Sequence, residues 1–534
     1  MTEEAARQGG FFSPHLTGIG RGYIMRAFGG TPVAALAEEC LFSARVTAGA
    51  WRGISMNFRL IFNTMGYILW VEAGFLMLPP VVALVYGENC WLAFLLSATL
   101  CGVVGTLLHL VKPKKVQMHS RDGFMAVALS WILLSLFGAI PYMLTGVLDS
   151  YVDAVFETVS GLTTTGSTVF NGVEWLPKSV LFWRSLTQWM GGMGVLVLFL
   201  ALTPRQGEGA VFLMRAESPG PIKSKLVPKV GGTAKILYVI YVALTAAEAV
   251  CLRIAGEDWF FAVNHALTTM ATGGFSTRDV SIAGQSTAVM WIITVFSFLA
   301  GVNFSLMFLA VRGKLKTVLR SEELRVYVGV VVCTTLLLCL NLHVQAGIPF
   351  SQSVTDAAFQ TVTIISTTGY ATVDFALWPT FCRMALVMLM FTGACAGSTS
   401  GGIKISRVMI LCKSLKRELK RLAHPNHVSV VKMDGQAVEE RVVSAAGAFM
   451  AAYVLVLLVG ALVVSWDNFG FQESFAASLT CISNVGPGLG LLGPMENFAI
   501  LSPLSKITLS LEMLMGRLEL MPMVALLLRS TWRD

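Results

Sequence analysis

Residues 160–166 read SGLTTTG, and three related segments follow: TTMATG ending at Gly273, IISTTG ending at Gly369, and TCISNVG ending at Gly486. The four glycines are 107, 96 and 117 residues apart, a spacing that predicts one unit copied four times. Hydroxyls, backbone carbonyls and a glycine with unusual backbone freedom are the groups that a dehydrated monovalent cation needs. One such segment could simply line a helix contact in a membrane, but four at matching places favour a pore. The sequence therefore indicates an ion-conducting membrane protein.

The composition places the chain in a lipid bilayer. Apolar residues make up 55% of it and charged residues 13%, and the mean hydropathy is +0.69, beyond the usual range of soluble domains. The apolar stretch at 381–395 is too short to span a membrane by itself. It continues past a glycine cluster to about Leu422, which predicts one long helix broken in the middle. A spanning helix needs about 20 residues, and stretches with few or no charges recur at 60–86, 91–111, 123–147, 179–203, 236–256, 286–311, 326–346, 381–395, 443–465 and 500–528.

Loop charge predicts the orientation, because basic loops stay in the cytoplasm. The basic segments are 112–121, 204–235, 312–325 and 413–441. The segments on the opposite side hold twelve acids and only two basic residues, and they carry the four glycine motifs: 147–178, 257–279, 343–378 and 466–499. We therefore expect an outer, acidic face with the motifs and both termini in the cytoplasm. The net charge of +8 reflects this topology and headgroup contact, and nothing in the pattern indicates nucleic-acid binding.

Each unit reads as an outer helix, a short segment, a glycine loop and an inner helix. The predicted fold is an all-α membrane protein, with two leading helices plus four outer helix, pore loop, inner helix repeats around one central pore. Tyr151 to Thr165 is too short to cross about 30 Å of hydrocarbon, so we expect a half-helix that enters and returns. Asp153, Asp356 and Glu473 each precede their glycine by thirteen residues, which predicts an acid at each half-helix N-terminus. The partially negative C-terminal ends would then favour a cation at the membrane centre.

The chain divides into six predicted parts. Residues 1–57 form an N-terminal extension that we expect in the cytoplasm, with no cleavable signal peptide, because the first long apolar run begins near Phe58. The other parts are 58–111 for the two leading transmembrane helices, 112–204 for pore repeat one, 205–313 for repeat two, 314–425 for repeat three with its broken inner helix, and 426–534 for repeat four.

The glycine cluster in the third unit reads FTGACAGSTSGGIK, from Phe391 to Lys404. Such a Gly/Ser stretch has weak helix propensity and would unwind at membrane depth, which is tolerated where it lines a cavity or is buried in protein. It would lie beneath the pore loops. A kink without function is one interpretation, and a flexible gate across the inner half of the pore is the other.

Arg517, in LEMLMGRLELMP, lies near the middle of the last span. A charge there costs about 2.5–3.5 kcal/mol on insertion scales, so it must face water or a partner. Neither Glu512 nor Glu519 has the spacing of a favoured helix pair with it. Arg517 is expected to face the pore, with an acid on a neighbouring helix as the alternative partner.

Other classes of protein have weaker support. The ten cysteines show no CxxC or metal-type spacing, and no HExxH, GxSxG, Walker or paired-carboxylate motif suggests an enzyme. A proton-coupled solute or cation carrier is the alternative function, with Glu72, Glu248 and Glu512 as the spanning acids of a relay. None of the three pairs with a nearby histidine, as a relay would need.

The sequence resembles the TrkH-type membrane subunits of bacterial potassium uptake systems, within the Trk/Ktr/HKT superfamily. The likeness runs from about Phe58 to Asp534. Besides the glycine segments, it rests on QWMGGMGV at Gln188 to Val195, RAESPGP at Arg215 to Pro221, ATGGFSTRDVSI at Ala271 to Ile282, GACAGSTSGGIK, RELKRLAHPN at Arg417 to Asn426, SNVGPGLG at Ser483 to Gly490, and MGRLEL at Met515 to Leu520. The loop departs slightly from the family, with GSTSGG where GSTGGG is commoner.

The resemblance implies a homodimer with one pore per subunit in the bacterial cytoplasmic (inner) membrane. It also implies a cytosolic, nucleotide-binding regulatory partner of the TrkA kind, K+ as the transported ion and no cofactor in this chain. Glycine at all four filter positions implies potassium over sodium, because sodium-preferring relatives replace the first with serine. The implied K+-binding filter comprises Thr164, Thr165, Gly166, Ala271, Thr272, Gly273, Thr367, Thr368, Gly369, Asn484, Val485 and Gly486. The implied gating residues are Gly393, Gly397, Ser398, Thr399, Ser400, Gly401, Gly402 and Arg517.

Overall fold

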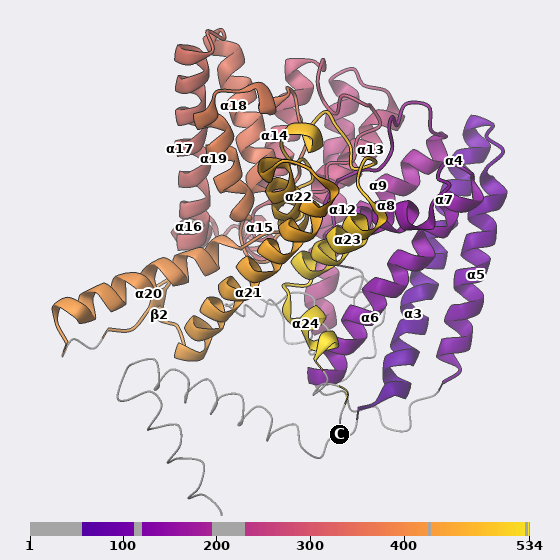
Figure 1. Cartoon of the computed structure of the whole chain (residues 1–534), viewed down its shortest axis with the longest axis horizontal. Coiled ribbons are helices and arrows are strands. Elements are labelled where there is room, and N and C mark those ends of the chain that lie inside the picture. The colour runs from indigo at the N-terminus through magenta and orange to yellow at the C-terminus, as the bar shows by residue number, and fades with distance from the viewer. Residues whose placement is uncertain (1–55, 112–119, 195–229, 426–428, 529–531, 533–534) are drawn as a thin grey trace, which may run out of the picture. The chain divides into compact units, whose positions relative to one another are not determined.

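Long apolar helices follow one another through the part of the chain that the computed structural model describes, which comprises residues 56–111, 120–194, 230–425, 429–528 and 532 (Figure 1). Residues 57–531 belong to one compact unit. The predicted RAESPGP motif and the extension 1–57, apart from its last two residues, lie outside the described residues. The helices confirm the predicted all-α membrane class.

The first half of the described chain contains α3 (Phe58–Leu76), α4 (Leu78–Tyr86), α5 (Trp91–His109), α6 (Ser120–Gly138), α7 (Ile140–Leu144), α8 (Tyr151–Leu162), α9 (Lys178–Gly192), α12 (Val230–Ile254), α13 (Trp259–Met270), α14 (Thr287–Ala300) and α15 (Phe304–Val311). The second half contains α16 (Leu315–Arg320), α17 (Glu322–Gln345), α18 (Phe350–Ile365), α19 (Thr380–Phe391), α20 (Ile405–Ala423), α21 (Glu440–Val464), α22 (Phe471–Ser483), α23 (Pro503–Arg517) and α24 (Met521–Leu527). Short 3-10 turns lie at Phe375–Leu377, Ser465–Asp467 and Gly490–Leu492, and strands β1 (Lys432–Met433) and β2 (Gln436–Ala437) form a small antiparallel hairpin.

Six helical stretches in the described residues are long and apolar enough to span a membrane. They are Phe58–Tyr86, Trp91–His109, Arg121–Leu144, Ala234–Ile254, Glu322–Gln345 and Glu440–Asp467. Tight contact holds the first two together, since a Cβ built on Gly66 would lie 2.6 Å from the Gly105 carbonyl oxygen. Small residues permit this close approach of helices within a membrane.

The helices α8, α13, α18 and α22 are 12, 12, 16 and 13 residues long. At 1.5 Å per residue they reach about 18–24 Å, too short to cross the hydrocarbon. Asp153 and Glu473 lie in the first turns of α8 and α22, as predicted. Asp356 does not lie in the first turn of its helix, because α18 begins six residues earlier, at Phe350. The Asp356 carboxylate accepts a hydrogen bond from Thr372 Oγ1 at 3.1 Å. In the second unit Asp258 caps α13 by accepting from the Phe260 and Phe261 N–H groups.

The helices that follow the glycine segments are shorter than the apolar runs suggested. The run at 286–311 is not one straight helix, because α14 and α15 meet at an angle of 100°. Asn303 explains the turn, since its side chain caps α15 through the Ser305 N–H. The run at 500–528 also breaks after α23, where Glu519 and Leu520 have positive φ. The predicted break in the third unit separates α19 from α20.

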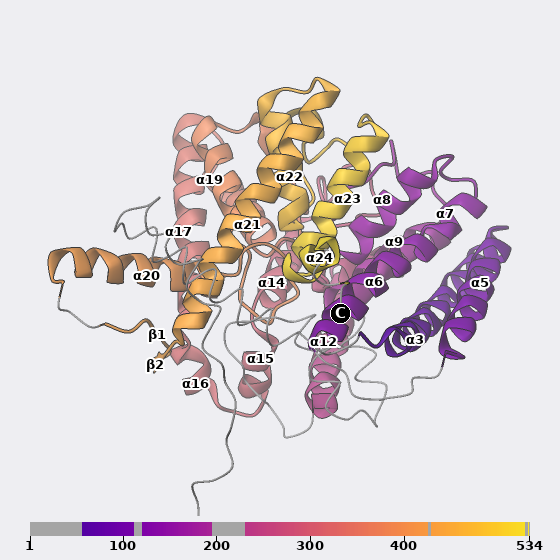
Figure 2. The same cartoon turned by 60° about the horizontal axis from the view of Figure 1, so that its bottom comes forward.

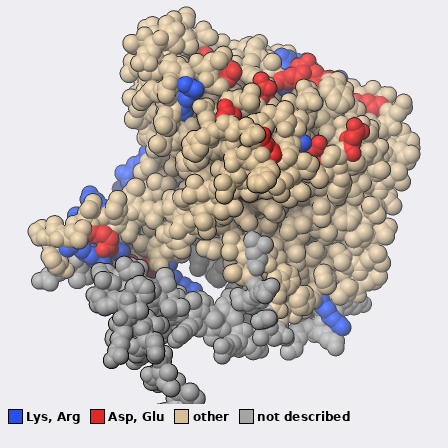
Figure 3. Space-filling view, viewed as in Figure 1, with Lys and Arg blue, Asp and Glu red and all other residues tan. Residues whose placement is uncertain are grey.

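Helix α20 extends sideways from the other helices in both views of the chain (Figures 1 and 2). Its charged residues form a largely basic region at the lower left of the space-filling view, whereas acidic side chains gather near the upper end of the same view (Figure 3). Basic and acidic residues therefore gather at different ends of this view, as the predicted division into basic loops and acidic loops requires.

Candidate functional site

The four glycine segments share one backbone conformation. In each, a residue with left-handed φ is followed two positions later by a glycine with positive φ. The pairs are Thr164 and Gly166, Thr272 and Gly274, Thr367 and Gly369, and Asn484 and Gly486, and their first members have φ between 54° and 59°. Non-glycine residues rarely adopt this conformation, so four matching occurrences point to a required geometry.

The second segment differs by one residue from the sequence-based prediction. Comparison of the four segments within the sequence gave Gly273 as the equivalent glycine, but the glycine with positive φ is Gly274. The motif ATGG contains two consecutive glycines, and spacing alone could not decide between them. On this correspondence, the residues that precede the four positive-φ glycines are Thr165, Gly273, Thr368 and Val485.

The carbonyl oxygen of each of these residues lies beside the positive-φ glycine of a neighbouring segment, so the four segments form a closed ring of contacts. We call these four oxygens the carbonyl ring. A Cβ built on Gly166 would lie 2.1 Å from the Gly273 oxygen, and one on Gly274 would lie 2.0 Å from the Thr368 oxygen. A Cβ on Gly369 would lie 2.0 Å from the Val485 oxygen, and one on Gly486 would lie 2.6 Å from the Thr165 oxygen. Each segment therefore abuts the next in chain order, and the fourth abuts the first.

Hydroxyl and amide contacts bind the segments to one another and to their own half-helices. The Thr163 and Thr165 hydroxyls lie 2.8 Å apart, and the same spacing recurs between the Ser366 and Thr368 hydroxyls. Asn484 Nδ2 donates to Thr165 Oγ1 at 3.0 Å, which links the fourth segment to the first. The segments follow the C-terminal ends of α8, α13, α18 and α22, whose partial negative charge favours a cation.

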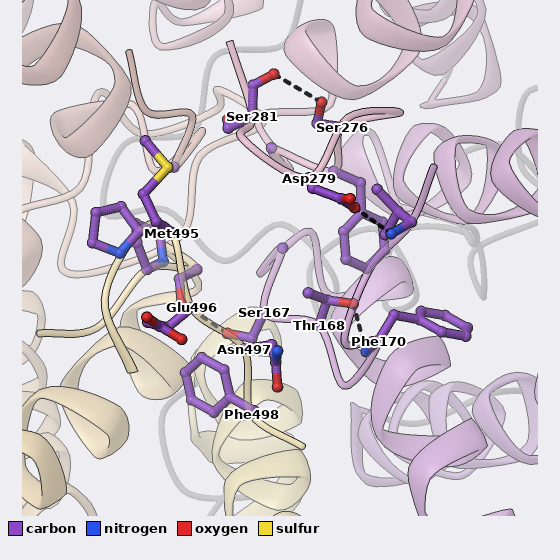
Figure 4. Close-up of a pocket in the computed structure, with 18 of the residues that line it drawn as sticks. Ser167, Thr168, Phe170, Ser276, Asp279, Ser281, Met495, Glu496, Asn497 and Phe498 are labelled. Carbon is purple, nitrogen blue, oxygen red and sulfur yellow. Dashed lines mark hydrogen bonds between the residues drawn. The ribbon is translucent and has the colours of Figure 1, made fainter. Parts of the chain in front are cut away.

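A pocket lies on one side of the carbonyl ring, and all four positive-φ glycines line it (Figure 4). Ser167 Oγ spans two segments there by donating to the Gly486 carbonyl at 2.9 Å. Asp279 accepts a hydrogen bond from the Val173 N–H at 2.5 Å and so ties the loops that follow the first two segments. Glu496 and Asn497 line the same pocket from the loop after the fourth segment.

The predicted gating residues lie in the non-helical stretch 392–404, which we call the Gly/Ser loop. The loop folds back on itself, because the Gly393 N–H donates to the Ile403 carbonyl at 2.9 Å. It contacts the third glycine segment directly, since the Gly401 N–H donates to Thr367 Oγ1 at 2.7 Å. A Cβ on Gly401 would also lie 2.5 Å from the Ser483 carbonyl oxygen, beside the fourth segment. Gly397, Ser398, Thr399, Ser400 and Gly402 complete the loop.

Charged groups surround the Gly/Ser loop. Arg517 donates to the Thr399 carbonyl at 2.7 Å and to the Gly191 and Gly192 carbonyls at 2.6 and 2.5 Å. It therefore connects the loop to the C-terminal end of α9. Lys404 Nζ donates to the Ser400 carbonyl, and to the Gly401 carbonyl at 3.3 Å.

An acid fastens the two ends of the loop. Glu323 Oε1, on α17, accepts from the Ala396 N–H at 2.7 Å and from the Ser406 N–H at 3.2 Å. One carboxylate thus joins the beginning of the loop to the start of α20.

Sequence reasoning did not single out three buried polar residues beside the carbonyl ring: Glu157, Arg184 and Gln188. Arg184 was recognisable, because it is a charge within the apolar run 179–203, and an ionisable residue at membrane depth indicates a functional site. Gln188 carried no comparable signal beyond its place in QWMGGMGV.

Known proteins share this architecture. A family model described as "TrkH: Cation transport protein" matches residues 93–531. The chain is 38% identical over 489 residues to the Trk system potassium uptake protein TrkH of Escherichia coli K12, covering 90% of this chain and 100% of that protein. It is 33% identical over 472 residues to the Trk system potassium uptake protein TrkI of Halomonas elongata, covering 88% and 96%.

A solved structure is also similar. The crystal structure of the potassium transporter TrkH from Vibrio parahaemolyticus matches with a TM-score of 0.80 and 35% sequence identity, over 90% of this chain and 100% of that one. The fold and these matches place the chain in the class of multi-pass membrane proteins that transport cations. The chain belongs to the TrkH family of cation transport proteins.

Proposed function

We propose that this chain conducts K+ into the cell down its electrochemical gradient, through the axis of the carbonyl ring. The observation that carries the proposal is the closed ring of backbone oxygens from Thr165, Gly273, Thr368 and Val485. Carbonyl oxygens at close quarters replace the hydration shell of a monovalent cation. The relatives named for potassium uptake support K+ as the ion.

The filter in this proposal comprises the residues expected from the family resemblance, with Gly274 added in the second unit. Glycine at the four positive-φ positions permits the tight packing of neighbouring segments, because any side chain would meet a carbonyl oxygen. This packing fixes the positions of the oxygens and supports a preference for potassium over sodium.

The Gly/Ser loop and Arg517 form the gate in this proposal. Contacts of the loop with Thr367 support a position next to the filter, and Arg517 adds a positive charge that opposes cations. We further propose four pore repeats with the boundaries given above, a homodimer, and regulation by a cytosolic nucleotide-binding partner of the TrkA kind. The basic loops and α20 would face the cytoplasm in a bacterial inner membrane, with both termini on that side.

Expression in a cell that lacks its own potassium uptake tests the function. Restored growth at low external potassium is the expected result. Failure to grow, with uptake of sodium or another solute by the same cells, would contradict the proposal. In liposomes at zero membrane potential, uptake that requires a proton gradient would instead support the alternative of a proton-coupled carrier.

A further inference from the structure

Three buried polar side chains of the first unit contact the glycine segments or the residues that follow them, and ion conduction does not by itself explain them. Glu157 is on α8, and Arg184 and Gln188 are on α9; they are 0%, 2% and 0% exposed. Burying such groups is costly unless each finds partners. The hydrogen-bond partners of the three side chains therefore indicate their role.

Gln188 uses both ends of its amide on the second glycine segment. Its Nε2 donates to the Gly273 carbonyl at 2.6 Å, and its Oε1 accepts from the Phe275 N–H at 3.1 Å. The amide thus clamps the backbone on either side of Gly274. A carbonyl oxygen has two lone pairs, so the Gly273 oxygen can accept from Gln188 and still face the axis.

The clamp also explains the two consecutive glycines in the second unit. A Cβ built on Gly273 would lie 2.3 Å from Gln188 Cδ, so a larger residue there would displace the Gln188 amide and break the clamp. Gly274 is required for two other reasons: its φ is +75°, and a Cβ there would lie 2.0 Å from the Thr368 carbonyl oxygen.

Arg184 and Glu157 extend the same support to the residues that follow the segments. Arg184 Nε and Glu157 Oε1 are 2.7 Å apart, and Glu157 also accepts from the Val169 N–H at 3.0 Å. Arg184 Nη1 donates to the Ser276 carbonyl at 3.3 Å, and its guanidinium lies 4.1 Å from the centre of the Phe275 ring. The pair therefore joins the exit of the first segment to the exit of the second.

We propose that Gln188, supported by the Arg184–Glu157 pair, is a positioning residue that sets the ion preference of the ring by fixing the Gly273 carbonyl. This inference rests on the proposed function, because it presumes that the ring binds the ion. Amide geometry suits the task, since a single side chain supplies both the donor and the acceptor that the turn needs.

Substitution of Gln188 by Leu tests the inference, because leucine retains much of the volume and loses both hydrogen bonds. In liposomes that contain the purified protein, the ratio of K+ to Na+ flux is expected to fall about tenfold, which corresponds to about 1.4 kcal/mol of lost discrimination. Trp189→Phe is the matched control. Trp189 follows Gln188 on α9, and its Nε1 donates to Thr245 Oγ1 on α12 at 3.2 Å. Loss of this bond should leave the flux ratio unchanged.

If Q188L does not insert, Q188M carries the same test. Methionine is unbranched like glutamine but has no N–H group, so it cannot donate to Gly273. An unchanged flux ratio in whichever of these variants folds would overturn the inference. A wild-type protein that carries no K+ would instead contradict the proposed function.

A double substitution checks the contact itself. Gly273→Ala alone should impair transport, because its Cβ meets the Gln188 amide, whereas Gly273→Ala with Gln188→Ala should recover part of the flux. If the double variant is no better than Gly273→Ala alone, Gln188 is not what confines position 273, and the clamp is wrong.

Discussion

The first and third units of the chain support their glycine segments in opposite ways. In the first unit, Arg184 and Gln188 lie eighteen and twenty-two residues after Gly166. The same two distances after Gly369 in the third unit lead to the apolar residues Val387 and Phe391. Polar side chains of α9 fasten the first two segments, whereas the third segment is contacted by the Gly/Ser loop through Thr367.

In the ring of contacts each segment abuts its neighbours in chain order, so the first and third segments lie across the axis from each other. One side of the ring is fastened by buried polar groups, and the other meets a stretch of weak helix propensity. In the proposed function, this difference assigns ion preference and gating to opposite sides of the ring. Substitutions of Gly166 and Gln188 should change the preference, whereas changes to the Gly/Ser loop and Arg517 should change the flux.

The largest effect is expected from Gly166→Ser. The new Cβ would lie 2.1 Å from the Gly273 carbonyl oxygen, at a φ of +87°, and so would displace two parts of the ring at once. We expect the K+ preference over Na+ to fall by at least about tenfold, measured as flux of the two ions in liposomes.

A matched control for this substitution is Gly146→Ser. Gly146 has a φ of +70° but no heavy atom within 4 Å of its built Cβ, so it carries the backbone strain without the contact. Its ion preference should equal that of the wild type. An unchanged preference in Gly166→Ser itself would show that Gly166 is not in the filter.

The next effect is expected beside the Gly/Ser loop, from Arg517→Ala on α23. A unit charge 4 Å from a cation opposes it by about 4 kcal/mol in partly screened surroundings, so its removal should raise K+ flux at least about tenfold. The K+ to Na+ ratio should not change, because the ring is untouched. Arg517→Lys keeps the charge without the fork that reaches Thr399 and Gly191 together, and it should give an intermediate flux.

Deletion of Ser398 to Ser400 should produce a smaller rise in flux. It shortens the steric barrier and removes the Thr399 carbonyl that binds Arg517, but the charge of Arg517 and its bonds to Gly191 and Gly192 remain. The flux should also depend less on the cytosolic partner. A deletion variant that inserts normally and conducts more slowly would indicate that the loop assists permeation, and the gate would then lie elsewhere.

The smallest effect is expected from Ser167→Ala, on the first side. It removes the bond to the Gly486 carbonyl and should lower the free energy of unfolding by about 1 kcal/mol. Thermal unfolding in detergent measures this change. Ion preference should stay close to that of the wild type, since the segment contacts at Thr165 remain.

Much of this arrangement could be predicted from the sequence. Apolar runs gave the helical membrane class, and Gly393 to Gly402 predicted the interruption between α19 and α20, because a glycine cluster weakens a helix. The run 286–311 gave no such warning. Its sharp bend depends on Asn303 acting as a cap, and capping by one polar residue is a weak signal within an apolar stretch.

The details of the ring were less accessible. The choice between Gly273 and Gly274 depends on φ and on the packing of Gln188, which a motif cannot reveal. Asp356 shows the same limit, because its place on α18 depends on where the helix begins. Contacts between residues as distant in the chain as Asn484 and Thr165 arise only from the folded arrangement.

The central claim, that the carbonyl ring binds the transported ion, is tested most directly with thallium, a heavy monovalent cation that substitutes for potassium. Crystals of the wild-type protein grown with Tl+ should show anomalous density on the axis between the oxygens of Thr165, Gly273, Thr368 and Val485. The same density should weaken when K+ competes and should be absent from Gly166→Ser. Strong thallium density elsewhere along the pore, with none within the ring, would contradict the account.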